Sequence, residues 1–152
     1  MFRGSTQISL DAKGRMALPA RYRDRLRELS EGKMVITYTL ERYLQLVPLP
    51  TWLQFEEKLV KAPVTDKRAK AYQMIFISNA VEVDMDSSGR VLIPQLLREG
   101  AGIDKHVILS GMLKTFHILP DSRYQTDLDD AFEYVKNYES STSEDFFTDL
   151  TM

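Results

Sequence analysis

Hydrophobic and polar residues alternate over short runs at the start of the chain, a pattern typical of half-buried β-strands. We predict strands over residues 7–10 and 15–18, joined as a hairpin by the turn D-A-K-G at residues 11–14. Asp accepts hydrogen bonds from the backbone of such a turn, and Gly permits the positive φ that closes it. Pro19 fits the first turn of a following helix, whose apolar face we expect to hold Tyr22, Leu26 and Leu29.

The next stretch combines a second predicted hairpin with a longer helix. The β-branched run M-V-I-T-Y-T is expected to pair with R-Y-L-Q-L-V, and Pro48 and Pro50 then introduce a helix. We expect this helix to turn Trp52, Phe55 and Leu59 inward. Residues 62–66 form the best linker, where Thr65 could cap a further helix that runs through Ile75 and joins the two halves.

The second half of the chain repeats the first. The stretch LDAKGRMALPARYR, which begins at Leu10, returns 75 residues later as MDSSGRVLIPQLLR. The match pairs Asp11 with Asp86, Gly14 with Gly89, Arg15 with Arg90, Pro19 with Pro94 and Arg23 with Arg98. A second match relates residues 32–48 to residues 104–120. Each half is therefore predicted to contain a hairpin, a short helix, a second hairpin and a longer helix, in that order.

This repeat predicts the domain organisation. We expect one hairpin-helix repeat over residues 1–62, a connecting helix and linker over 63–77, and a second repeat over 78–138. The last helix should run from about Asp121 to Tyr138, with Tyr124, Leu128, Phe132 and Val135 on one face. Residues 139–152 carry four acids and no base, so we expect an acidic, disordered tail. Since one half has too little chain to cover its own strands, the halves should cover each other as a pseudo-symmetric sheet, with further copies from other subunits.

Composition narrows the functional classes only moderately. The chain has no cysteine, so disulfides and thiolate metal sites are excluded, and a cytoplasmic location is expected. No apolar run has the length of a transmembrane helix, and the N-terminal M-F-R-G-S-T-Q lacks the apolar region of a secretory signal. We therefore expect no membrane partner.

Charge is distributed unevenly along the chain. Residues 1–75 hold 14 basic and 8 acidic residues, a net +6, whereas residues 76–152 hold 6 and 14, a net −8. The segment from Arg3 to Arg27 contains seven basic residues and only two acidic ones, Asp11 and Asp24. A polyanion is thus expected to bind the N-terminal half, although a merely solvated basic face would have the same composition.

The N-terminal M-F-R-G, the two D-x-x-G-R signatures and the Pro-initiated helix after each signature together resemble the MraZ family of bacterial transcriptional regulators. The resemblance extends from Met1 to about Tyr138, and the doubled signature makes it specific. It implies an α+β fold, a tandem pseudo-symmetric AbrB-like swapped-hairpin β-barrel with peripheral helices. It also implies ring-shaped homo-oligomers in the cytoplasm, associated with the nucleoid. Their partner would be double-stranded DNA at promoter repeats ahead of the cell-division and cell-wall gene cluster.

The family motif D-x-x-x-R falls on Asp11 with Arg15 and on Asp86 with Arg90. The first copy carries Lys13 and is followed by arginines, whereas the second is flanked by Glu82, Asp84 and Glu99. The phosphates of DNA should therefore bind near the first copy of the motif in preference to the second. We predict DNA contacts by four residues of the basic half: Arg15, Lys13, Arg3 and Arg21. Structural roles in the two turns are expected for Asp11, Gly14, Asp86, Gly89 and Arg90.

The expected binding mode is a two-stranded ribbon in the major groove. There Arg15 could donate two hydrogen bonds to guanine, which are worth about 1–3 kcal/mol of discrimination. Lys13 would hold phosphate instead. The alternative is that Arg15 pairs with Asp11 across its own turn and only stabilises the hairpin.

Other chemistries fit the sequence less well. D-M-D-S-S-G from Asp84 matches half of a calcium-binding loop, but Gln95 stands where a bidentate Glu is needed. His106 and His117 lie in apolar strand patterns without a third ligand at metal spacing. No nucleophile–base pair or phosphate loop is recognisable, so we expect no enzyme activity, no cofactor, no metal and no small-molecule substrate. The competing function is a non-enzymatic protein-binding module, such as an antitoxin-like partner or an assembly scaffold, which would use the acidic half to bind a basic partner.

Overall fold

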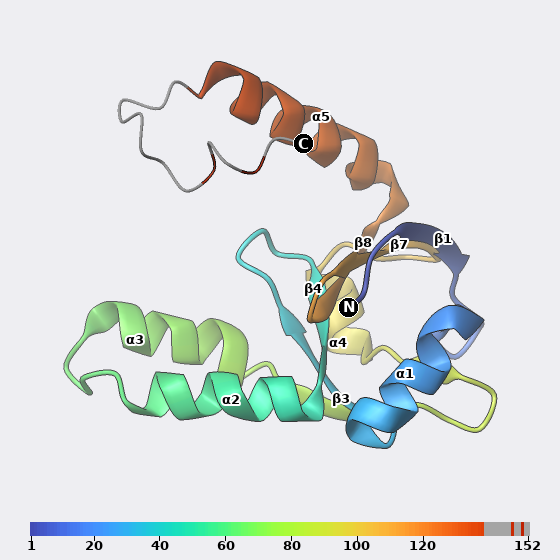
Figure 1. Cartoon of the computed structure of the whole chain (residues 1–152), viewed down its shortest axis with the longest axis horizontal. Coiled ribbons are helices and arrows are strands. Elements are labelled where there is room, and N and C mark those ends of the chain that lie inside the picture. The colour runs from blue at the N-terminus through green and yellow to red at the C-terminus, as the bar shows by residue number, and fades with distance from the viewer. Residues whose placement is uncertain (139–146, 148–149, 151–152) are drawn as a thin grey trace. The chain divides into compact units, whose positions relative to one another are not determined.

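The chain divides into two compact units in a computed structural model that describes residues 1–138, 147 and 150. The first unit is Met1–Asp121 and the second is Ser122–Met152 (Figure 1). The expected disorder of the tail concerns residues that lie almost entirely outside the described ones. Among the described residues, none of the helices combines the length and apolarity that crossing a bilayer requires.

The predicted strands and helices are present, with bounds that shift by a few residues. The first repeat contains β1 (Ser5–Ser9), β2 (Arg15–Ala17), α1 (Ala20–Ser30), β3 (Lys33–Tyr38), β4 (Leu44–Pro48) and α2 (Leu49–Val60). The second repeat contains β5 (Val81–Asp84), β6 (Arg90–Leu92), α4 (Gln95–Gly100), β7 (His106–Met112), β8 (Thr115–Pro120) and α5 (Asp121–Asn137). Between the repeats lie α3 (Lys67–Tyr72) and a π-helical turn, η1 (Gln73–Ile77).

The strand pattern predicts that the first two strands pair within each repeat, and this prediction is wrong. The strands are exchanged between the repeats, in keeping with the swapped-hairpin fold that the resemblance implies. β1 pairs antiparallel with β7, from Ser5 opposite Ser110 to Ser9 opposite His106. Reciprocally, β5 pairs with β3. The second strands, β2 and β6, pair with each other. Only the later hairpins, β3–β4 and β7–β8, form locally as expected.

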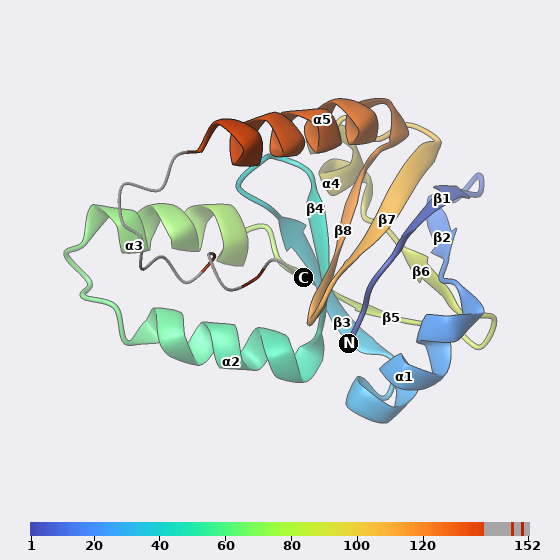
Figure 2. The same cartoon turned by 45° about the horizontal axis from the view of Figure 1, so that its top comes forward.

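The strands form one large sheet and one small ribbon. The six-stranded sheet has the order β1-β7-β8-β4-β3-β5, so its hydrogen-bonded ladder ends at β1 and β5 and does not close into a barrel. The two-stranded ribbon is β2–β6. The D-x-x-G-R turns connect β1 to β2 and β5 to β6, and therefore link both edges of the large sheet to the ribbon. Figure 2 shows β2 beside β6, with the two turns toward opposite ends of the ribbon.

Both repeats contribute to one hydrophobic core. Its fully buried members include Met16 and Ile36 from the first repeat and Val91, Leu109 and Phe116 from the second. The N-terminus is also part of this core. The ring of Phe2 packs against Phe116 with centroids 4.3 Å apart, and the backbone of Phe2 forms reciprocal hydrogen bonds with Leu113. The expectation that the halves cover each other is thus confirmed within a single chain.

A second, smaller cluster covers the other face of β3 and β4. Trp52 is buried there against Val35 and Val47, and Phe55 packs beside it. Phe55 in turn contacts Phe76 of η1, with ring centroids 5.7 Å apart. The inward orientation predicted for this face of α2 is therefore correct for Trp52 and Phe55.

Three local predictions need correction. Leu29 is 41% exposed, because α1 buries Tyr22, Leu26 and Ser30, residues spaced by four, and Ser30 Oγ donates to the carbonyl of Leu26. The cap of α3 is Asp66 rather than Thr65, since its carboxylate accepts the N–H of Arg68 at 2.8 Å.

The third correction concerns α5. Phe132 and Val135 are exposed, because α5 has no buried residue among those described. The apolar face predicted for this helix is therefore partly buried at Tyr124 and Leu128 and exposed at Phe132 and Val135.

Candidate nucleic-acid interface

The first D-x-x-G-R turn is organised around the carboxylate of Asp11. Its Oδ1 accepts the backbone N–H groups of Lys13 at 3.0 Å and Arg15 at 2.8 Å, and its Oδ2 accepts the Nε–H of Arg15 at 2.7 Å. The N–H of Arg15 and the Arg15 side chain stabilise the charged carboxylate, so the pKa of Asp11 lies below its ordinary value of 3.8. The turn is closed by a hydrogen bond from the N–H of Gly14 to the carbonyl of Asp11 at 2.9 Å.

The second turn has the same geometry. Asp86 Oδ1 accepts the N–H groups of Ser88 at 2.9 Å and Arg90 at 2.8 Å, and its Oδ2 accepts Arg90 Nε–H at 3.1 Å. The hydrogen bond from the Arg90 backbone is the main cause that lowers the pKa of Asp86. N–H donors thus engage both carboxylate oxygens of this turn. The described residues contain no group of three or more metal-ligating acids or histidines.

The structural role expected for these aspartates and arginines is supported by two ion pairs, Arg15 with Asp11 and Arg90 with Asp86. The ion pair engages Nε, whereas a guanidinium has two further nitrogens that can donate.

Each turn is also held by the opposite repeat, a relationship that the strand pattern does not predict. The N–H of Ile93 donates to the carbonyl of Gly14 at 3.1 Å, and the N–H of Leu18 donates to the carbonyl of Gly89 at 2.9 Å. The closing arginines of the motif are exchanged as well. Arg98 lies against Gly14 and Arg23 lies against Gly89, so closely that a Cβ on either glycine would clash with the arginine. The only sequence signal for these contacts is that Arg23 and Arg98 occupy equivalent positions in the repeat.

The ribbon brings the two motif arginines onto one face. Met16 and Val91 point into the core, whereas Arg15, Ala17, Arg90 and Leu92 lie on the opposite face. Arg15 is directly opposite Leu92, and Arg90 is directly opposite Ala17. The two arginines are therefore diagonal neighbours in the ladder, a relationship that typically separates residues by about 7–8 Å. Residues that lie 75 positions apart in sequence share one outward surface.

The four predicted DNA contacts fall into two groups. Lys13 is exposed at the tip of the first turn, and Arg15 is half-buried where β2 begins. Arg3 and Arg21 instead meet at Tyr22, whose hydroxyl donates to the carbonyl of Arg3. Arg21 stacks over the Tyr22 ring at 4.5 Å and donates to Thr6 Oγ at 2.9 Å. Among the described residues, no hydrogen bond or ion pair joins one group to the other.

The exchange of strands changes the charge argument drawn from the sequence. One arginine of the cluster that follows turn one, Arg23, lies against Gly89 of turn two. Conversely, Arg98 of α4 in the second repeat, the neighbour of Glu99, lies against Gly14 of turn one. The two turns consequently differ less in charge than their sequence neighbours suggest. An asymmetry remains, because turn one has Lys13 where turn two has Ser88.

The two histidines lie apart from the ribbon. His106 is exposed at the start of β7 and hydrogen-bonds Ser9 Oγ at 3.0 Å. His117 is partly buried in β8 against the ring of Tyr43, and this burial lowers its pKa below 6.5 despite the opposing effect of Glu41.

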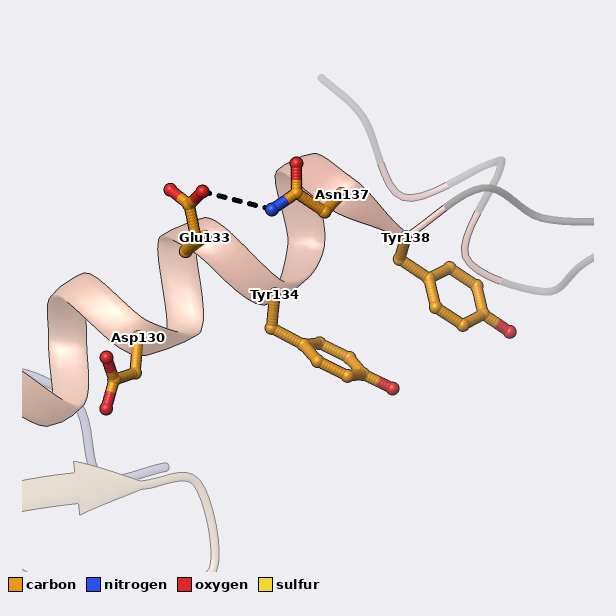
Figure 3. A pocket seen from close by; sticks show the side chains of 5 residues that line it. All are labelled: Asp130, Glu133, Tyr134, Asn137 and Tyr138. Carbon is orange, nitrogen blue, oxygen red and sulfur yellow. Dashed lines mark hydrogen bonds between the residues drawn. The ribbon is translucent and has the colours of Figure 1, made fainter.

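A shallow hollow on α5 contains none of the predicted site residues. Figure 3 shows its five lining side chains, four on α5 and Tyr138 directly after it, with Asn137 donating to Glu133 at 3.0 Å. The rings of Tyr134 and Tyr138 lie 5.8 Å apart. Since all five lining residues are exposed and two are acidic, the hollow lacks the features of an anion site.

These observations define a class of protein, a tandem α+β chain with exchanged strands and two D-x-x-G-R turns on one ribbon. A family model described as "MraZ protein, putative antitoxin-like" matches residues 1–75 and again residues 76–145. The chain belongs to the MraZ family, and its fold is the AbrB-like arrangement that the resemblance implied, without a closed barrel.

Individual relatives extend over most of the chain. The Transcriptional regulator MraZ of Nitrosomonas europaea is 42% identical over 134 residues, which cover 88% of this chain and 90% of the relative. The protein of the same name from Methylococcus capsulatus is 48% identical over 118 residues, 78% of each chain. That from Shewanella oneidensis is 37% identical over 145 residues, 95% of each chain.

One solved structure is also similar. The solution structure of PHS018 from Pyrococcus horikoshii is 14% identical and covers 79% of this chain and 97% of its own, with a TM-score of 0.34. This likeness is too distant to carry a structural argument.

Proposed function

We propose that this chain is a transcriptional regulator that binds double-stranded DNA with the first D-x-x-G-R turn and the β2–β6 ribbon. The observation that carries the proposal is the position of Lys13 and Arg15 on an outward turn that begins one strand of the ribbon. The relatives named as transcriptional regulators support the same function.

The geometry of Arg15 suits recognition of a base. Its Nε is anchored by Asp11 at 2.7 Å, so the two terminal nitrogens of the guanidinium can still donate. A two-stranded ribbon fits the major groove, where an arginine can donate two hydrogen bonds to O6 and N7 of guanine. In this mechanism Asp11 orients the guanidinium, and the ion pair seen in the free protein is retained when DNA binds.

The other cations supply affinity without reading the sequence. Lys13, exposed beside Arg15, binds phosphate. Arg3 and Arg21 are weaker contacts, because Arg21 already donates to Thr6 and Tyr22. The ion pairs of Asp86 with Arg90 and of Asp11 with Arg15 hold the turns in the required shape.

The biological setting follows from the family resemblance. We infer that the DNA target is a set of promoter repeats ahead of the bacterial cell-division and cell-wall gene cluster, that the protein acts in the cytoplasm at the nucleoid, and that it has no enzymatic activity. We also infer a closed homo-oligomer, in which several ribbons bind repeated sites together and raise the overall affinity. Light scattering should give a mass several times the 17.5 kDa of one chain. A strict monomer at micromolar concentration would contradict the assembly.

A mobility-shift assay tests the function directly. The purified full chain is mixed with the region upstream of its own gene and with a scrambled fragment of equal length, each at two salt concentrations. Specific retardation of the upstream fragment, weaker at higher salt, is the expected result. Absence of retardation even at low salt would favour the alternative, a protein-binding module.

A further inference from the structure

The guanidinium of Arg98, from the second repeat, lies directly against the backbone of the first turn. Gly14 has φ +86° and is buried, and a Cβ placed on it would be 2.6 Å from Arg98 Cζ and 2.8 Å from both Nε and Nη2. Only a residue without a side chain leaves room for this contact. The residue that follows Gly14 is Arg15, so Arg98 contacts the point at which the turn becomes β2.

A single residue, Ile93, connects Arg98 to this turn by hydrogen bonds. The N–H of Ile93 donates to the carbonyl of Gly14 at 3.1 Å, while the carbonyl of Ile93 accepts the Nε–H of Arg98 at 3.0 Å. Arg98 therefore holds Ile93, directly after β6, and Ile93 in turn holds the first turn at Gly14. The arrangement needs a planar group that donates from Nε along one edge and packs flat on the glycine, which a lysine cannot provide.

The same arrangement occurs a second time with different surroundings. Arg23 donates through Nε to the carbonyl of Leu18 at 2.8 Å, the N–H of Leu18 donates to the carbonyl of Gly89, and the side chain of Arg23 lies against Gly89. Because the same geometry occurs in both repeats, it is a feature of the fold and not a chance rotamer of one side chain. They also supply a matched control, because Arg23 supports the turn that lacks Lys13.

Arg98 also leaves the local charge of the first turn positive. Among residues 1–138, no carboxylate forms an ion pair with Arg98 or Arg23, although both are only partly exposed. A neutral residue at position 98 would remove this charge as well as the planar contact. Substitution by lysine keeps the charge and removes only the contact.

We propose that Arg98 is a positioning residue for the DNA-reading turn of the opposite repeat: it lies across Gly14, holds Ile93, and so sets the direction from which Arg15 meets a base. This inference rests on the proposed function, since it assigns the second repeat a role in the specificity of the first. Arg98 acts through the backbone of the turn and contributes no base contact of its own.

The experiment compares Arg98→Lys with Arg23→Lys in the full-length chain. Amide hydrogen exchange, followed by mass spectrometry on the free protein, reports the turns without any DNA. Arg98→Lys should speed exchange in peptides that cover residues 11–18, and Arg23→Lys in peptides that cover residues 86–93. Light scattering checks that each variant keeps the mass of the unaltered protein. If Arg98→Lys does not assemble, Arg98→Gln, which retains an N–H donor, replaces it with the same measurements.

DNA affinity provides the second measurement, on the upstream and scrambled fragments. Arg98→Lys should weaken binding to the upstream fragment about five- to a hundredfold, the range for removal of a bidentate base contact, and should leave binding to the scrambled fragment and the salt dependence unchanged. Arg23→Lys should leave both affinities within about twofold, a change below the range expected for one base contact. An equal loss on both fragments would make Arg98 a phosphate contact and overturn the proposal.

Two further outcomes separate this inference from the function on which it rests. Specific binding that survives Arg98→Lys, or unchanged exchange over residues 11–18, overturns the positioning role alone. If the unaltered chain shows no specific binding, the proposed function fails and the positioning role fails with it, whatever the exchange data show.

Discussion

Asp11 holds Arg15 by two different groups of that residue, the backbone N–H at 2.8 Å and the side-chain Nε at 2.7 Å. The carboxylate thus couples the shape of the turn to the orientation of the guanidinium. Asp86 and Arg90 repeat the relationship at 2.8 Å and 3.1 Å. A change at either aspartate should therefore alter the stability of a turn, and a change at Asp11 should also alter the presentation of Arg15.

The two aspartates predict how stability depends on pH. Both have folded-state pKa values below 3.8, so their contribution is complete above that pH and is lost as the pH falls through the lowered pKa. Asp11→Asn should lower the melting temperature at pH 7 and reduce its decline as the pH falls below about 4, the ordinary Asp pKa. Thermal unfolding from pH 7 downward measures both effects. Asp86→Asn is the matched control, and an unchanged acid decline in both variants would contradict the assignment.

His117 predicts a separate effect at higher pH. Burial lowers its pKa below 6.5, so the neutral ring is favoured in the folded state, and stability should fall as the pH drops below about 6.5. His117→Gln should remove this part of the decline and leave the part due to the aspartates. Thermal unfolding between pH 8 and 5 is the measurement, with the exposed His106→Gln as control. If the melting temperature of His117→Gln declined as much as that of the unaltered protein, the decline would have to come from other titratable groups.

The glycines of the turns should be intolerant of a side chain. Gly14 has φ +86° and Gly89 has φ +78°, so alanine at either position costs about 1–2 kcal/mol from the backbone conformation alone. The added Cβ must also displace Arg98 or Arg23. Both variants should therefore unfold at lower temperature in a thermal scan. Only Gly14→Ala should weaken specific DNA binding, and a comparable effect of Gly89→Ala would show that the second turn also binds DNA.

Local chemistry explains what could be predicted from the sequence. The turns were predictable because D-x-x-G-R contains its own hydrogen-bond partners, and the β3–β4 and β7–β8 hairpins because their strands are neighbours in sequence. The exchange of β1 with β5 was not predictable from the strand pattern, since Ser9 opposes His106 and such a pattern does not specify its partner. It was implied only by the family resemblance, through its swapped-hairpin fold. The contacts of Arg23 and Arg98 depend on that exchange, so alignment of the repeats revealed their equivalence but not their role. The exposure of Leu29 was not predictable either, because the sequence pattern does not specify which row of α1 side chains faces the core.

Lys13→Ala tests the phosphate contact. An exposed lysine that binds phosphate adds affinity for every sequence, so its removal should weaken binding to the upstream and scrambled fragments alike. The slope of log affinity against log salt should decrease by about 0.9 for each phosphate that the variant no longer neutralises. Mobility shifts at four or more salt concentrations give this slope. An effect confined to the upstream fragment would instead make Lys13 a base contact.

The last prediction compares the two motif arginines, which lie diagonally on the outer face of the β2–β6 ribbon. If the first turn reads DNA, Arg15→Ala should remove about 1–3 kcal/mol of specific binding per engaged subunit. Several subunits bound to repeated sites would multiply this effect. The oligomer should stay assembled, because both Arg15 and Asp11 are partly exposed and such an ion pair contributes little to stability.

Arg90→Ala should leave DNA affinity nearly unchanged, because its turn lacks Lys13. It should lower the melting temperature only slightly, because the pair of Arg90 with Asp86 is partly exposed, like that of Arg15 with Asp11. The measurement is the affinity of both variants for one upstream fragment, with oligomer mass checked by light scattering. Since the ribbon presents both arginines on one face, equally weakened binding would mean that the two turns bind DNA together. Weakened binding with Arg90→Ala alone would overturn the charge argument for the first turn, because the turn without Lys13 would then be the one that reads the base.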